Sequence, residues 1–141
     1  MSEVIVRSLG NFQNEVIYGE GQTFIIDEPV SAGGDGAGPD PYTLILAALG
    51  GCISMTVMMY ARRKNWPLES VRVRLRQRRI HAGDCAECAQ SESGYIHLIE
   101  RRVEFDGPLT DEQRARLREI ASRCPVHRTL TSRIAIAEMQ D

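Results

Sequence analysis

The sequence predicts a single α+β domain over residues 1–141, with short strands first and one long apolar helix near the middle. Three observations support this: β-rich runs in the first third, residues 41–61 without a charged side chain, and an alternating apolar and basic run after Trp66. A chain of 141 residues is long enough for one domain with a core and too short for two ordinary ones. The expected order of elements is β-β-β-α-β-β-α-β.

Three short strands are predicted in the first third of the chain, over residues 4–6, 15–18 and 23–26. The tripeptide Gly19-Glu20-Gly21 supplies a turn between the last two. A glycine-rich segment, residues 31–39, follows them. It is not a phosphate-binding loop, because no Gly-Lys-Ser/Thr follows the glycines. We expect a flexible connector here in preference to a ligand-cradling loop.

A long helix is predicted from Pro41 to about residue 64, with Asp40 as its N-cap and Pro67 barring its continuation. It is apolar on nearly every face, which is typical of a helix buried on several sides. A single sheet covers only one side, so we infer a second partner, another subunit. Gly50 and Gly51 weaken a helix, which indicates that something packs closely against the backbone there.

The same stretch has the length of a membrane span, because residues 41–61 carry no charge. Gly50, Gly51, Ser54 and Thr56 in its middle argue against a span. A span there would also separate strands that need each other. A buried core helix is the preferred interpretation, with no membrane partner.

The second half begins with a half-buried strand whose residues alternate in character. Valine and leucine occupy one face and arginine the other: Val71, Val73 and Leu75 against Arg72, Arg74, Arg76 and Arg78. The arginines form either a solvated face balanced by neighbouring acids or a surface for an anionic substrate or partner. A second strand over residues 95–105 is expected to complete a hairpin, and its alternation shifts near Glu100, which predicts a β-bulge.

Residues 110–113, Thr-Asp-Glu-Gln, form a capping box that opens a second helix. The Cys124-Pro125 pair interrupts this helix, and a short turn follows. Residues 134–136, Ile-Ala-Ile, are predicted to close the fold as a last strand.

Charge and cysteine content restrict the function further. The net charge is −2, from 17 basic and 19 acidic side chains, which gives no electrostatic reason to expect nucleic acid as a partner. Residues 1–4 lack the basic start and apolar run of a secretory signal, so we expect a cytoplasmic protein. Four cysteines in such a protein are typical of catalytic, redox or metal-binding thiols.

Local chemistry distinguishes Cys124 from Cys52. Cys124 precedes Pro125 and can cap a short helical turn, where free N–H groups favour a thiolate, and His127 lies three residues on. The alternative is a small buried residue at a helix break. Cys52 sits among apolar residues in the long helix, where burial raises the pKa of a thiol and makes it inert. On local grounds, core packing is therefore the preferred role for Cys52.

The remaining two cysteines, Cys85 and Cys88, form a Cys-Ala-Glu-Cys motif in the hairpin loop between His81 and His97. These four residues have the types of a tetrahedral zinc site, and apart from zinc at this loop we expect no cofactor. The alternatives are a reversible disulfide between Cys85 and Cys88, or free thiols.

Three segments together resemble the OsmC/Ohr family: residues 33–42, residues 46–52 (Leu-Ala-Ala-Leu-Gly-Gly-Cys) and residues 123–130 (Arg-Cys-Pro-Val-His-Arg-Thr-Leu). They are most similar to an uncharacterised OsmC-like branch with a Cys-Pro-Val-His motif. The resemblance implies an intertwined homodimer with the long helices at its centre and active sites at the dimer interface. It also implies that Cys52 and Cys124 are neighbours in space.

The family resemblance reverses the local ranking of the two thiols. It implies that Cys52 attacks an organic hydroperoxide and becomes a sulfenic acid, and that Cys124 resolves it as a disulfide, which a dithiol then reduces. The family's glutamate after the helix-opening proline is Tyr42 here, and the family's N-terminal arginine region reads Gly-Asn-Phe-Gln-Asn at residues 10–14. We therefore expect Tyr42 and Arg128 to bind the substrate and His127 to be catalytic together with Cys52 and Cys124.

Three functional hypotheses follow. The first is a thiol peroxidase of the oxidative-stress response that uses Cys52 and Cys124. The second is a non-enzymatic protein that binds a metal or small ligand through His81, Cys85, Cys88 and His97. In the third, both cysteine pairs are structural remnants in an interaction protein.

Overall fold

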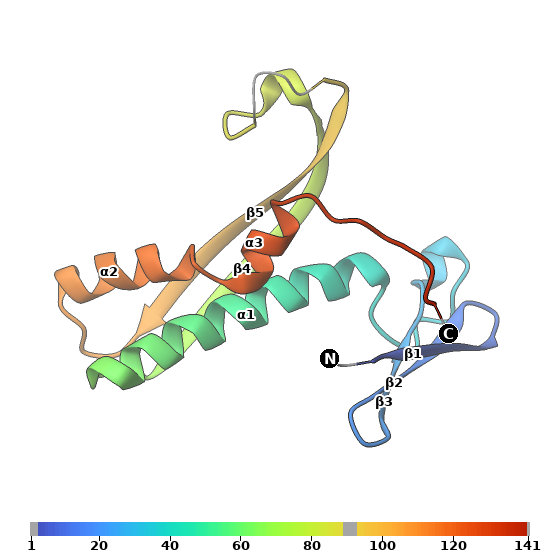
Figure 1. Ribbon diagram of the computed structural model, residues 1–141, viewed down its shortest axis with the longest axis horizontal. Helices are drawn as coiled ribbons and strands as arrows, with labels where there is room; N and C mark the ends of the chain where they lie inside the picture. The colour runs from blue at the N-terminus through green and yellow to red at the C-terminus, as the bar shows by residue number, and fades with distance from the viewer. Residues whose placement is uncertain (1–2, 89–92, 141) are drawn as a thin grey trace. The chain divides into compact units, whose positions relative to one another are not determined.

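The computed structural model describes residues 3–88 and 93–140 and confirms the α+β class (Figure 1). The chain divides into two compact units, Met1–Ile45 and Leu46–Asp141, which are described in turn. The expected terminal strand is the main departure from the predicted order of elements.

The first unit contains a three-stranded antiparallel sheet in the order β1-β2-β3. Its strands are β1 (Ile5–Gly10), β2 (Gln13–Tyr18) and β3 (Gln22–Ile26). The predicted strands are confirmed and run longer than expected. Asn11, with φ 48°, turns the chain between β1 and β2, and Gly19 and Gly21 have the positive φ that the predicted turn requires. Val16 on β2 is the buried apolar residue of this sheet.

Asp27 organises the glycine-rich segment that follows β3. Its buried carboxylate accepts hydrogen bonds from the backbone N–H groups of Glu28 (2.8 Å), Asp35 (3.1 Å) and Ala37 (3.0 Å). A side chain at Gly34 would collide with the Glu28 carbonyl, because the loop folds tightly around this carboxylate. The segment, which includes the 3-10 turn η1 (Val30–Ala32), thus has a defined conformation and is not the flexible connector that its composition suggested.

The long helix α1 (Pro41–Lys64) has the predicted bounds. The Thr43 N–H donates to the Asp40 carboxylate at 2.8 Å, as an N-cap requires. The helix begins in the first unit and continues into the second. Its buried residues recur every three or four positions and therefore form one stripe: Leu49, Gly50, Ile53, Val57 and Ala61.

The opposite side of α1 stays uncovered within one chain. Met55 is 67% exposed and Met59 is 64% exposed. By length and composition, α1 is the one helix among the described residues that could cross a membrane, with a mean hydropathy of 1.9, and 22% of that window is buried. The described elements of the chain therefore bury one side of α1, whereas the sequence predicted burial on several sides.

The second unit is built around a two-stranded antiparallel ribbon, β4 (Ser70–His81) and β5 (Tyr95–Asp106) (Figure 1). Its register is unbroken from Ser70↔Asp106 to His81↔Tyr95, so the bulge predicted near Glu100 is wrong. The alternation shifts for another reason: Arg101 occupies a core-side position opposite Leu75. Its guanidinium donates to the Ser122 hydroxyl at 3.2 Å, which lets a charged side chain replace an apolar one without moving the backbone.

Two shorter helices pack with the ribbon and α1. Helix α2 (Asp111–Ala121) opens with the predicted capping box, and α3 (Pro125–Leu130) opens with Cys124 as N-cap. Gly50 lies where α1 crosses the ribbon: a Cβ there would come within 2.8 Å of Leu75 Cδ1, which explains the glycine. Gly51 has no such neighbour within residues 3–88 and 93–140. The core cluster joins these elements through Leu49, Ile53, Val57, Ala61, Phe105, Leu117, Ala121 and Cys124.

The predicted last strand is absent, since residues 133–140 have no regular secondary structure. Ile134 is 57% exposed, Ile136 97% and Met139 83%. A strand requires a paired edge, and no described strand of the chain pairs with this segment. The prediction of a closing strand is therefore wrong for the single chain.

Candidate functional site

The second unit brings Cys52 and Cys124 together. Cys52 lies in the fourth turn of α1 and is half-buried, whereas Cys124 is fully buried at the start of α3. Both are free thiols. The two side chains share a hydrogen bond, although 71 residues separate them in the chain. The core cluster holds both, because Cys124 belongs to it and Cys52 packs against it.

Hydrogen bonds set the ionisation of Cys52. Burial raises the pKa of this thiol, but hydrogen bonds from the Cys124 thiol, the Val126 N–H and the Thr56 hydroxyl together outweigh the burial. The pKa of Cys52 is therefore lowered from the ordinary value of a thiol. Each of these donors stabilises the negative sulfur, which is the form that reacts as a nucleophile.

The opposite holds for Cys124. Burial raises the pKa of its thiol, and the hydrogen bond with Cys52 raises it further. Backbone N–H groups of His127, at 3.4 Å from the sulfur, and of Val126 act in the other direction without overcoming the rise. Cys124 therefore remains the protonated partner and donates to Cys52. The N-cap position predicted for Cys124 is confirmed, but it does not make Cys124 the more acidic thiol.

Thr56 is a site residue that the sequence reasoning missed. It lies one helical turn after Cys52, and residues at i and i+4 share one face of a helix. The sequence did offer a signal for Thr56, namely a hydroxyl four residues after Cys52 on the same helix. The role of the Val126 N–H had no such signal, because it depends on how α3 docks against α1.

His127 and Arg128 belong to α3, with His127 half-buried and Arg128 exposed. Neither the His127 nor the Arg128 side chain alters the pKa of Cys52, and no other cation among the described residues does so. Within the first unit, Arg7 pairs with Glu15 across β1 and β2 at 3.1 Å. Tyr42 is 50% exposed in the first turn of α1. Hydrogen bonds, not a cation, lower the pKa of Cys52.

The loop at the end of the ribbon holds a disulfide between Cys85 and Cys88, one of the alternatives that the sequence left open. His81 Nδ1 accepts from the Gly83 N–H at 3.3 Å, and His97 lies opposite Arg79 in the register. No group of three or more histidine, cysteine or acidic side chains among the described residues is arranged to hold a metal ion. The predicted zinc set is therefore not assembled, because its two sulfurs bond to each other.

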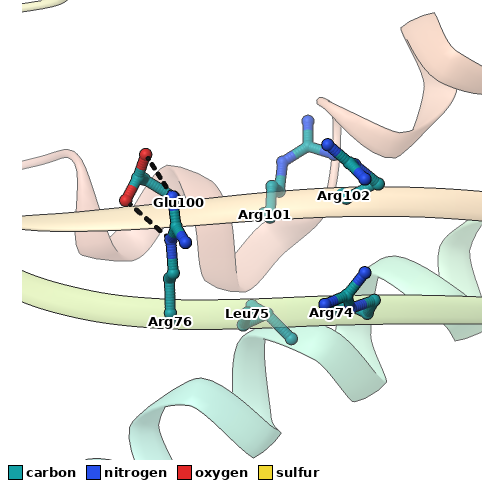
Figure 2. Close-up of a pocket in the computed structure, with 6 residues that line it drawn as sticks. All are labelled: Arg74, Leu75, Arg76, Glu100, Arg101 and Arg102. Carbon is teal, nitrogen blue, oxygen red and sulfur yellow. Dashed lines mark hydrogen bonds and ion pairs between the residues drawn. The ribbon is translucent and has the colours of Figure 1, made fainter.

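Each unit of the described structure contains a cavity. One of about 460 Å³ is on the ribbon and is lined by Arg74, Leu75, Arg76, Glu100, Arg101 and Arg102 (Figure 2). The other, of about 530 Å³, lies in the first unit beside Phe12 and Asp27. Neither is lined by Cys52 or Cys124.

Comparison with models of known protein families identifies the family of this chain. The family model described as OsmC-like protein matches residues 33–138, a span that includes the sulfur pair and most of the chain. The chain belongs to the OsmC-like family. Comparison with curated proteins yields no match.

Solved structures place this OsmC-like protein among relatives of the same fold. A Psychrobacter arcticus osmotic stress induced and detoxification response protein has a TM-score of 0.71 at 19% identity, with 92% of this chain and 88% of that chain covered. An OsmC-like protein of Mycoplasma pneumoniae has a TM-score of 0.70 at 17% identity, with coverages of 92% and 86%. The organic hydroperoxide resistance protein OhrB of Bacillus subtilis has a TM-score of 0.61 at 18% identity, with coverages of 93% and 90%. At these low sequence identities, the structural similarity establishes a shared fold alone.

Proposed function

We propose that this OsmC-like protein is a thiol peroxidase that reduces organic hydroperoxides, with Cys52 as nucleophile and Cys124 as resolving thiol. The observation that carries the proposal is the hydrogen-bonded pair in which the pKa of Cys52 is lowered and that of Cys124 is raised. Such a division provides one thiolate and one nearby thiol. Structural relatives that are named organic hydroperoxide resistance proteins support the choice of substrate class.

The reaction follows from the roles of the two sulfurs. The Cys52 thiolate attacks the outer oxygen of the hydroperoxide, the O–O bond breaks, and the alkoxide takes a proton to leave as an alcohol. Cys52 is then a sulfenic acid. The Cys124 sulfur attacks the Cys52 sulfur, water leaves, and a disulfide forms. A dithiol reduces this disulfide by thiol exchange and is itself oxidised to a disulfide.

Steady-state turnover tests the proposal. Oxidation of dithiothreitol by cumene hydroperoxide is measured for the parent protein, Cys52→Ser and Cys124→Ser, with Cys85→Ser as the matched control at a cysteine outside the site. We expect Cys52→Ser to lose at least about 100-fold in rate, because the nucleophile is gone. Cys124→Ser should still form a sulfenic acid, visible as a 16 Da gain by mass spectrometry. A Cys52→Ser protein with the parent rate contradicts the proposal.

We also propose that the protein acts as a homodimer in the cytosol. The exposed apolar side of α1, with Met55 and Met59, and the uncovered residues Ile134 and Ile136 support a second copy of the chain as the covering partner. A cytosolic location supplies the dithiol reductant that the proposed cycle consumes.

A further inference from the structure

The β4–β5 ribbon has an outer face that is rich in arginine. Core-side residues such as Val73 and Val103 pack toward α1, and side chains alternate along a strand, so the intervening positions point to the other side. We call this side the arginine face and define it by Arg72, Arg74, Arg76, Arg78 and Arg102, with the carboxylates of Glu100, Glu104 and Asp106 between them. Five arginines against three carboxylates give this face an excess of positive charge in a chain whose net charge is −2.

Each of the three carboxylates on the arginine face either accepts a hydrogen bond or lies opposite an arginine. Glu100 accepts from Arg76 at 3.0 Å and from Arg78 at 3.2 Å, and these pairs lower the pKa of Glu100, with the Arg76 hydrogen bond as the largest cause. Asp106 accepts from the Ser70 hydroxyl at 2.7 Å. Glu104 lies opposite Arg72 in the register.

Arg74 and Arg102 are left facing each other. They are directly opposite in the register, and within residues 3–88 and 93–140 neither forms an ion pair. Directly opposite side chains in an antiparallel pair have Cβ atoms about 5 Å apart, where two like charges destabilise the sheet. Two like charges at directly opposite positions oppose the stability of the strand pair. Features that lower stability in this way concentrate at functional sites.

The two guanidinium groups also line a cavity. It measures about 460 Å³ and lies beside the Arg76–Glu100 pair, with Arg74 on one strand and Arg102 on the other (Figure 2). This volume falls within the range of small-molecule sites. Arginine presents a planar fork of N–H donors that binds the oxygens of a phosphate group in pairs.

We propose that the Arg74–Arg102 pair is a binding site for a small phosphate-bearing molecule. An anion with two or more negative charges removes the repulsion between the guanidinium groups and accepts hydrogen bonds from both strands. Arg74 and Arg102 occupy register positions that alternate with the core-side residues facing α1, and neither Cys52 nor Cys124 lines the cavity, so the pair is separate from the sulfur chemistry. The net charge of −2 gives no electrostatic reason to expect a nucleic acid as the occupant.

Binding of inorganic pyrophosphate to the full chain tests this site. Isothermal titration calorimetry at constant ionic strength compares the parent with Arg74→Gln and Arg102→Gln, and Arg72→Gln serves as the matched control. Arg72 is exposed on the same face and carries the same charge, but it lies opposite a carboxylate. We expect a loss of affinity of about tenfold or more in the two site variants and of less than about threefold in the control.

Two further measurements distinguish the alternatives. Either site variant should have a thermal midpoint equal to or above that of the parent without ligand, because the like-charge repulsion is relieved. Dithiol oxidation should keep the parent rate, so failure of this site is distinct from failure of the peroxidase proposal. The proposal is overturned by equal losses in all three variants, by no binding above a sodium chloride control, by a lower midpoint in both site variants, or by tighter binding of a DNA duplex than of pyrophosphate.

Discussion

At the scale of single residues, Cys52 shows how a half-buried thiol becomes acidic without a cation. Its own environment raises the pKa through burial, and three donors from two helices reverse the effect. The donors are a thiol, a backbone N–H and a hydroxyl, none of which carries a charge. Cys124 is therefore important before any disulfide forms, because its S–H bond stabilises the Cys52 thiolate.

The pH dependence of alkylation should report this arrangement. The folded-state pKa of Cys52 is lowered, so the thiolate persists to lower pH, and the rate of iodoacetamide alkylation at Cys52 should have its midpoint below that of an ordinary thiol. Cys124→Ala and Thr56→Val should each raise this midpoint, because each removes a donor. Residue-resolved mass spectrometry follows the reaction, and Ser54→Ala, on the same helix but not a donor to Cys52, is the control. Unchanged midpoints in both donor variants are incompatible with the hydrogen-bonding account.

Asp27 has a structural role that can be tested in the same way. Backbone hydrogen bonds, first from Ala37 and then from Glu28 and Asp35, lower the pKa of this carboxyl against the effect of burial. Its contribution to stability is present above the unfolded-state pKa of about 3.9 and is lost as the pH falls through the lower folded-state value. Asp27→Asn should therefore lower the thermal midpoint at pH 7 and reduce the parent's loss of stability below pH 4. Asp35→Asn, whose carboxylate accepts from the exposed Gln13 amide, is the control.

At the scale of elements, the capping box and the N-cap of α3 prepare the site. The Thr110 hydroxyl accepts from the Gln113 N–H at 3.1 Å, and the Gln113 side chain accepts from the Thr110 N–H at 3.0 Å. These bonds determine where α2 begins, and buried Leu117 anchors it in the core. The chain then reaches Cys124 directly after α2, so the position of this thiol depends on the start of the preceding helix.

Removal of the capping hydroxyl should therefore weaken the second unit. Thr110→Ala should destabilise the protein by about 1 kcal/mol, because the Gln113 N–H loses its acceptor. Urea unfolding followed by circular dichroism measures the change. Thr110→Ser retains the hydroxyl and should lie within about 0.5 kcal/mol of the parent. Equal losses in both variants would show that the Thr110 methyl group, not the cap, stabilises α2.

At the scale of the whole molecule, one chain does not cover its own apolar surface. Among the described residues, the side of α1 with Met55 and Met59 is exposed and residues 133–140 are unpaired, and the proposed homodimer would cover both. The same helix carries Cys52 on its half-buried side. In the proposed homodimer, assembly and the environment of the thiol would be coupled through α1.

A charge on the exposed side of α1 should break the assembly. Met59→Lys places an ammonium group where an apolar side chain is 64% exposed in the single chain, and we expect a dimer of the parent to become monomeric or to aggregate. Size-exclusion chromatography with light scattering measures the mass. Val30→Lys, a charge at a 73% exposed valine of the first unit, is the control and should remain dimeric. A dimeric Met59→Lys protein argues against α1 as the interface.

Much of the fold and part of the site follow from local patterns in the sequence. Helix α1 has its predicted bounds because Asp40 and Pro41 start the helix and Pro67 prevents its continuation, and each of these effects is local in the sequence. The capping box and the alternation of β4 are equally local. The bulge near Glu100 was wrong because Arg101 finds a partner, Ser122, on another element. The strand over residues 134–136 was wrong because an apolar run becomes a strand only where an edge is available.

The sequence by itself determined the α+β class, the bounds of α1 and the four cysteines from which any sulfur chemistry must come. Only the tertiary structure decided which thiol is acidic. Local reasoning favoured Cys124, since its N-cap position and Pro125 lie beside it in the chain. The docking of α3 on α1 instead brings the Cys124 thiol and the Val126 N–H to Cys52, and burial keeps Cys124 protonated. Ionisation depends on the donors that surround a sulfur in space, and folding places most of those donors far from it in sequence.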